Sequence, residues 1–64
     1  MLMRDVARDC NRSLTRSALS DSYVVSVKGG YYVIKRCGRT YDTTSEATHI
    51  TKIVEGIIER DGPK

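Results

Sequence analysis

Four arginines recur at every fourth position near the start of this 64-residue chain: Arg4, Arg8, Arg12 and Arg16. On a helix, residues four apart lie one above the other, so these side chains would form a ridge along one face. The planar guanidinium of arginine makes forked hydrogen bonds to phosphates and carboxylates. Like charges at this spacing repel one another by roughly a few tenths of a kcal/mol. The ridge therefore indicates an anionic partner, with a simple solvated helix face as the alternative.

A second group of cations lies in the middle of the chain, around the stretch "VKGGYYVIKRCGR". It consists of Lys28, Lys35, Arg36 and Arg39, and Tyr31 stands among them. An aromatic side chain offers area for packing, and neighbouring cations attract negative charge. The whole chain has a formal charge of +3, from 11 Lys and Arg against 8 Asp and Glu. This mild excess suits a nucleic acid or an acidic protein surface as the partner.

Residues for catalysis or metal binding are scarce. The single histidine, His49, follows Thr48 in a helical pattern, and no acid is placed to orient it as a base. The two cysteines, Cys10 and Cys37, match no zinc-ligand spacing, and one histidine cannot complete such a site. We therefore predict that the protein is not an enzyme and requires no cofactor and no metal.

The sequence also bears on location and association. No apolar run approaches the roughly 20 residues that span a bilayer, and the start "MLMRD" lacks the apolar stretch of a secretory signal. We expect no contact with a membrane and a cytoplasmic location, which includes the cytoplasm of a host cell. Both thiols should then be free, with a Cys10–Cys37 disulfide as the alternative. The small core, without Trp or Phe, favours a partner or a homodimer.

The apolar periodicity predicts one α+β domain over residues 1–64, with the element order α-β-β-β-α. Residues 1–19 form an arginine-rich helix, 22–43 a three-stranded antiparallel sheet, and 44–61 an amphipathic helix that packs on one face of the sheet. Gly29-Gly30 and Cys37-Gly38 supply the two tight turns. The first turn is expected to place Val25 opposite Ile34, and the second to place Tyr41 beside Ile34. The N-cap of the second helix could be Thr43, Thr44 or Ser45. Thr43 and Glu46 have the spacing of a capping box. Gly62 and Pro63 end this helix.

Alternation along the strands assigns side chains to the two faces of the sheet. The face expected to receive the second helix, with Ile57 near the centre of the helix's apolar arc, carries Tyr23, Val25, Val27, Tyr32, Ile34 and Tyr41. The other face mixes apolar, polar and basic residues: Val24, Ser26, Lys28, Tyr31, Val33, Lys35, Thr40 and Asp42. Either the first helix covers all or part of this second face, or the face is simply hydrated, or it is exposed and contacts a partner. All three interpretations are open from the sequence alone.

Residues 22–58, centred on "GGYYVIKRCGRTYDTTSEA", resemble the small arm-type DNA-binding domains of tyrosine recombinases and the related plant AP2-type domain. The positions that carry the resemblance are Gly30, Tyr32, Gly38, Thr43 and Ala47. In those families the exposed face of a three-stranded sheet enters the major groove of DNA. The resemblance implies that the DNA-contacting residues here are Lys28, Tyr31, Lys35 and Arg39. The arginine-rich first helix has no counterpart in those families.

These features together predict a small, non-enzymatic nucleic-acid-binding protein that uses a basic sheet face and an arginine-lined helix. The predicted contact residues are Arg4, Arg8, Arg12, Arg16, Lys28, Tyr31, Lys35, Arg36 and Arg39. The alternative is a small phage-type regulator or inhibitor that docks on a host protein or protein complex. Affinity that falls steeply with salt would indicate phosphate contacts, whereas docking through Tyr and Val would depend on salt much less.

Overall fold

The computed structural model describes residues 2–62 and shows the predicted α+β fold with the order α-β-β-β-α. The elements are α1 (Met3–Arg16), β1 (Tyr23–Lys28), β2 (Tyr31–Arg36), β3 (Arg39–Thr44) and α2 (Ala47–Asp61). Met1, Pro63 and Lys64, which belong to the predicted domain of residues 1–64, lie outside the described residues. Within residues 2–62, neither helix has the length and apolar character that crossing a membrane requires.

The three strands form an antiparallel sheet in sequence order. The predicted register of the first hairpin is confirmed, with Val25 opposite Ile34. Its two-residue loop has φ values of +59° at Gly29 and +81° at Gly30, which glycine adopts without a steric penalty. The Cys37-Gly38 turn joins β2 to β3 in the same way. These two turns fix which side chains of neighbouring strands share a face.

A register shift in β3 changes one part of the predicted sheet. The pairs on its two sides are Lys35–Thr40 and Ile34–Asp42. Tyr41 is therefore the extra residue of a β-bulge, and its predicted position opposite Ile34 is wrong. Beyond the bulge the alternation is reversed, so Thr43 replaces Asp42 on the face that carries Lys35. The sequence does not reveal this bulge, because the residues of the strand can be assigned to alternate faces without a break.

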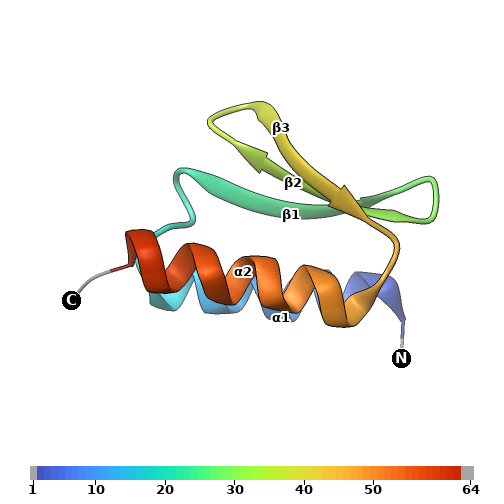
Figure 1. Ribbon diagram of the computed structural model, residues 1–64, viewed down its shortest axis with the longest axis horizontal. Helices are drawn as coiled ribbons and strands as arrows, with labels where there is room; N and C mark the ends of the chain where they lie inside the picture. Colours follow the sequence, from blue (N-terminus) through green and yellow to red (C-terminus); the bar gives the residue numbers. More distant parts are fainter. Residues whose placement is uncertain (1, 63–64) are drawn as a thin grey trace.

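Both helices pack on the same face of the sheet (Figure 1). α1 contacts β1 and α2, and α2 contacts β3, so the molecule has one layer of strands and one layer of helices. The two helices run in the same direction, because three strands separate them (Figure 1). The interpretation in which the first helix covers the second sheet face is therefore wrong, and that face is left open.

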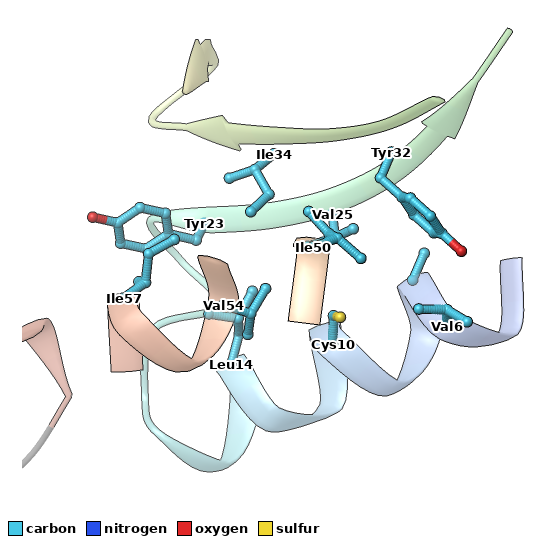
Figure 2. Packing of buried hydrophobic residues seen from close by; sticks show 11 residues of the cluster. Val6, Cys10, Leu14, Tyr23, Val25, Tyr32, Ile34, Ile50, Val54 and Ile57 are labelled. Carbon is cyan, nitrogen blue, oxygen red and sulfur yellow. The ribbon is translucent and has the colours of Figure 1, made fainter. Parts of the chain in front are cut away.

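One hydrophobic core fills the space between the two layers (Figure 2). Its buried residues are Val6, Ala7, Cys10, Leu14, Tyr23, Val25, Tyr32, Ile34, Ile50, Val54 and Ile57. The predicted placement of the second helix on the face with Val25 and Ile34 is thus confirmed. Two residues predicted for this face, Val27 and Tyr41, remain 38% exposed. Val27 lies near the end of β1, and Tyr41 lies on the edge strand in the bulge.

The start of α2 differs from the prediction. The helix begins at Ala47, and its N-cap residue, Glu46, makes no side-chain capping bond. Thr43 still belongs to β3, so the predicted capping box does not form. Instead the Glu46 N–H donates to Thr44 Oγ1 at 3.2 Å, and this hydroxyl also lies 3.2 Å from Nδ1 of His49. The side chain of His49 is exposed, as expected for a surface histidine.

The end of α1 is set by a Schellman motif with alanine at the left-handed position. Ala18 has a φ of +58°. The Leu19 N–H donates to the Leu14 carbonyl at 2.8 Å, and the Ala18 N–H donates to the Thr15 carbonyl at 3.1 Å. This reversal ends the helix at Arg16, three residues before the predicted boundary. It also lets Leu19 pack against the core.

We expect Ala18→Gly to stabilise the protein by about 0.5–1 kcal/mol, because the left-handed region strains a residue that has a Cβ. The greater freedom of glycine in the unfolded chain limits the gain. Denaturant titration measures the difference. Ala47→Gly, in the first turn of α2, is the matched control and should lower the stability. A loss of stability in Ala18→Gly would contradict the strain assigned to this position.

Candidate functional site

The sheet face turned away from both helices is uncovered along its length, and we call it the open face. By register it carries Val24, Ser26, Lys28, Tyr31, Val33, Lys35, Thr40 and Thr43. Tyr31 is 53% exposed and Val24 is 44% exposed. The register places two cations on this face and no carboxylate, because Asp42 pairs with Ile34 on the helix side. Exposed apolar area and unopposed positive charge are therefore combined on one surface.

A shallow depression of about 420 Å³ lies on the open face. Its lining includes the ammonium-bearing Lys28 and Lys35, the apolar Val33, and the hydroxyl-bearing Ser26, Thr40 and Thr43. Ammonium and hydroxyl groups donate hydrogen bonds to phosphate oxygens and to base edges. Tyr31 is the register partner of Lys28, so its exposed ring lies beside this depression. The arrangement can bind an anionic, partly aromatic surface.

Two predicted contact residues lie on the other side of the sheet. Arg36 pairs with Tyr23, and its guanidinium carbon lies 5.9 Å from the centre of the Tyr23 ring. Arg39 is the register partner of Arg36 and so shares its face. The structure therefore brings Lys28, Tyr31 and Lys35 together and separates Arg36 and Arg39 from them.

The four arginines of α1 form the predicted ridge, which we call the arginine ridge: Arg4, Arg8, Arg12 and Arg16, all exposed. They lie on the side of the helix opposite its buried residues, since their spacing of four repeats about every helical turn. Arg8 makes one ion pair, at 3.4 Å from Asp5, and both side chains are exposed, so this pair contributes little. Across residues 2–62, Asp9 and Arg12 form no ion pair with each other.

A side-chain network at one end of the sheet was not predicted. The Tyr23 hydroxyl donates to the Asp61 carboxylate at 2.7 Å and accepts from Arg60 at 3.3 Å. Arg60 also donates to Asp61 at 3.2 Å. Its guanidinium carbon lies 5.9 Å from the centre of the Tyr41 ring, which meets Tyr23 edge to face at 5.8 Å. The network ties the end of α2 to β1 and β3, and no sequence pattern marks groups so far apart in the chain.

The network shifts two titrations. The hydrogen bond to Asp61, together with burial, raises the pKa of Tyr23. Hydrogen bonds from Arg60 and Tyr23 lower the pKa of Asp61. Stabilisation through Tyr23 is therefore present below the pKa of an unfolded tyrosine, about 10, and is lost as the pH rises through the folded value. Stabilisation through Asp61 is present above about pH 4 and is lost as the pH falls through its lower folded pKa.

We expect Tyr23→Phe to lower the free energy of unfolding by about 1 kcal/mol near neutral pH, because it removes the phenol hydroxyl from the network. The difference from the wild type should narrow above about pH 10 and below about pH 4, where the wild type also loses the interaction. Thermal melts across this pH range measure it, with Tyr31→Phe on the open face as the control. A difference that does not change with pH would contradict the role of this hydroxyl.

The remaining candidate groups are the two cysteines. Cys10 and Cys37 are both free, the first buried and the second exposed, so the disulfide alternative is wrong. Burial raises the pKa of the Cys10 thiol, which keeps it protonated and unreactive. Cys10 lies in a groove of about 600 Å³ between α1 and α2 that Asp9 and Glu55 also line. In the described part of the chain, no three His, Cys, Asp or Glu residues lie close enough to hold a metal ion.

No family model, curated protein or solved structure matches this chain. The function therefore has to be inferred from the open face and the arginine ridge.

Proposed function

We propose that this protein binds nucleic acid through the open face. The observation that carries the proposal is a sheet face left uncovered by both helices, on which Lys28, Tyr31 and Lys35 lie together without a carboxylate. Tyr31, with half of its surface exposed, presents on this face an aromatic ring on which a base can stack. Lysines around an exposed aromatic ring are a common arrangement on surfaces that bind nucleic acids.

The spacing of these three side chains suits a ligand with repeated charges. Tyr31 and Lys35 lie four residues apart on β2, a distance of about 13 Å along the strand. Lys28 lies directly across from Tyr31. The two ammonium groups can contact phosphates at the two ends of the face while the Tyr31 ring, at the Lys28 end, packs on a sugar or base. Hydroxyls of Thr40 and Thr43 add donors toward base edges.

Duplex DNA is the first ligand to test, because residues 22–58 resemble domains whose sheet face enters the major groove. That resemblance implies Lys28, Tyr31, Lys35 and Arg39 as contacts. The register keeps the first three on the open face, whereas Arg39 shares the helix-facing side with Arg36. Duplex RNA and single strands are alternatives within the same proposal, since phosphate contacts and stacking are available on each.

Docking on a protein is the second candidate, favoured by the exposed apolar side chains of Val24 and Tyr31 on the same face. Aromatic residues at the centre of an interface often supply most of its binding energy. This candidate differs from the first in its salt dependence, because burial of apolar area does not release counterions.

An NMR titration of isotope-labelled protein with a short DNA duplex at low salt tests the proposal. We expect the amide signals of β1, β2 and β3 to shift most, and Lys28→Gln/Lys35→Gln to abolish these shifts. Lys52→Gln, an exposed charge on α2, is the control and should leave them unchanged. The logarithm of the affinity of the open face should fall with the logarithm of salt with a slope of about −1.8 for two phosphate contacts.

Two results would contradict the proposal. One is the absence of any shift with duplex DNA, duplex RNA or single strands at low salt. The other is a set of shifts in the strands that the double lysine variant leaves intact. Either result would favour protein docking as the role of the open face.

A further inference from the structure

We propose that one molecule joins two nucleic-acid segments, one on the open face and the other on the arginine ridge. This inference rests on the proposed function for the open face. It adds a second binding surface, which holds four of the cations in the chain. The consequence is a protein that bridges or compacts nucleic acid as a monomer.

The two surfaces point away from each other. α1 turns its buried residues, among them Leu14 and Cys10, toward the sheet and α2. The ridge lies opposite these buried residues; its Arg12 and Arg16 end turns away from the sheet, whereas Arg4 shares the side of α1 on which Asn11 bonds the edge of β1. Figure 1 shows the sheet above both helices, with the open face on top of the sheet and the helix layer beneath it. A straight duplex on the open face therefore lies across the domain from Arg12 and Arg16, and its backbone cannot also reach these two side chains.

The ridge has the dimensions of a backbone contact. Its members are about 6 Å apart along the axis, so Arg4 and Arg16 are separated by about 18 Å. One strand of a duplex presents a phosphate every 3.4 Å or so of axis, and about five phosphates fall within that length. Within residues 2–62, only Arg8 among the four arginines of the ridge has a carboxylate partner in ion-pair distance, and this pair is exposed. The other three guanidinium groups are available to phosphates.

The chemistry of the ridge favours nucleic acid over a protein partner. The large exposed apolar side chains of the described residues are Leu2, Val24, Val27, Tyr31 and Tyr41, and none of them lies within α1. A protein interface would be expected to have an apolar anchor near its centre. A row of arginines without such an anchor matches the repeated charge of a phosphate backbone, and binding one would relieve the like-charge repulsion along α1.

A two-duplex capture assay tests the inference. One DNA duplex is fixed to beads, the protein is added below the concentration of bound duplex, and a second, fluorescent duplex is then supplied. We expect the wild type to retain the second duplex. Arg12→Gln/Arg16→Gln should still bind a single duplex in fluorescence anisotropy but should lose the capture. These two positions are chosen because neither has an ion-pair partner, and glutamine is a good helix former.

Variants of the other surface make the test symmetrical. Lys28→Gln/Lys35→Gln should also bind a single duplex, through the ridge, and should also lose the capture. Lys52→Gln should capture as the wild type does. Circular dichroism of each variant establishes that the fold is intact, and sedimentation of the free wild type establishes that it is a monomer.

The outcomes separate the inference from the proposed function. A wild type that binds one duplex but never captures a second overturns bridging and leaves binding by the open face standing. A wild type that binds no nucleic acid overturns both. Undiminished capture by Arg12→Gln/Arg16→Gln, with the fold intact, overturns the role of the ridge. Capture only at concentrations where the protein dimerises overturns bridging by a monomer.

Discussion

Ile57→Ala is expected to unfold a large fraction of this protein. Ile57 is 2% exposed and belongs to the single core between the sheet and the helices (Figure 2). Removing most of a buried aliphatic side chain costs about 2–5 kcal/mol, because the contacts are lost and the cavity closes only in part. A domain of this size has a total stability of about 3–10 kcal/mol. The single substitution therefore removes much of the margin, and a thermal melt or a denaturant titration measures the loss.

Ile53→Ala on the same helix is the matched control. Ile53 is only partly buried and packs at the margin of the core, so its truncation should cost clearly less than that of Ile57. Equal melting temperatures for Ile57→Ala and the wild type would contradict the position of α2 on the sheet. Losses of the same size for both variants would contradict the order of burial along the helix.

The core could be predicted because each element is amphipathic with its own period. Ile50, Val54 and Ile57 follow the helical repeat, and Val25 and Ile34 follow the strand alternation, so the two patterns identify the surfaces that meet. The hairpin register followed from a two-residue loop in which both residues are glycines. The helical repeat, the strand alternation and the two-glycine loop are local features of the sequence, and the structure confirms the elements that each of them predicts.

The sequence of α1 does not show which face of the sheet the helix packs on, because an amphipathic helix can pack on any apolar surface. The decisive property belongs to the sheet, whose two faces differ. Tyr23, Tyr32 and Ile34 give one face a buried apolar centre, whereas Lys28 and Lys35 interrupt the other face. Burying Leu14 against that second face would have brought the lysines under a helix, at a high cost in desolvation.

The sequence identified the candidate contact residues, but we did not predict that they lie on separate surfaces. Lys28, Tyr31 and Lys35 share the open face, as strand alternation indicated. Arg36 follows Ile34 at the spacing of two that keeps residues on one face, and the Cys37-Gly38 turn then pairs it with Arg39. That signal was present in the sequence and placed both arginines on the helix side. The direction of the arginine ridge depended instead on which layer α1 joins.

The closed edge of β1 matters for both proposals. Asn11 on α1 donates its Nδ2–H to the Val25 carbonyl at 2.8 Å, and its Oδ1 accepts the Val25 N–H at 2.8 Å. The side-chain amide thus takes the place that a neighbouring strand would occupy. An unpaired strand edge is a template for pairing with another chain. Asn11 therefore helps to keep the sheet at three strands.

Asn11→Ala is expected to lower the free energy of unfolding by about 2 kcal/mol, because two partly buried backbone groups lose their partner at once. It should also make the protein associate as its concentration rises, through the exposed edge of β1. Denaturant titration and sedimentation measure the two effects. Thr15→Ala is the control: the Thr15 hydroxyl donates only to the Asn11 carbonyl, in an exposed position, and its loss should change the stability by less than about 0.5 kcal/mol.

The same variant connects the edge to the capture assay. Two molecules joined edge to edge at β1 would place two open faces in one continuous sheet, and such a dimer could hold two duplexes without the arginine ridge. Asn11→Ala should then capture the second duplex even when Arg12→Gln/Arg16→Gln is added, whereas that ridge substitution alone should not. A variant that stays as stable and as monomeric as the wild type would contradict the role of Asn11 at this edge, since solvent would then satisfy Val25 equally well.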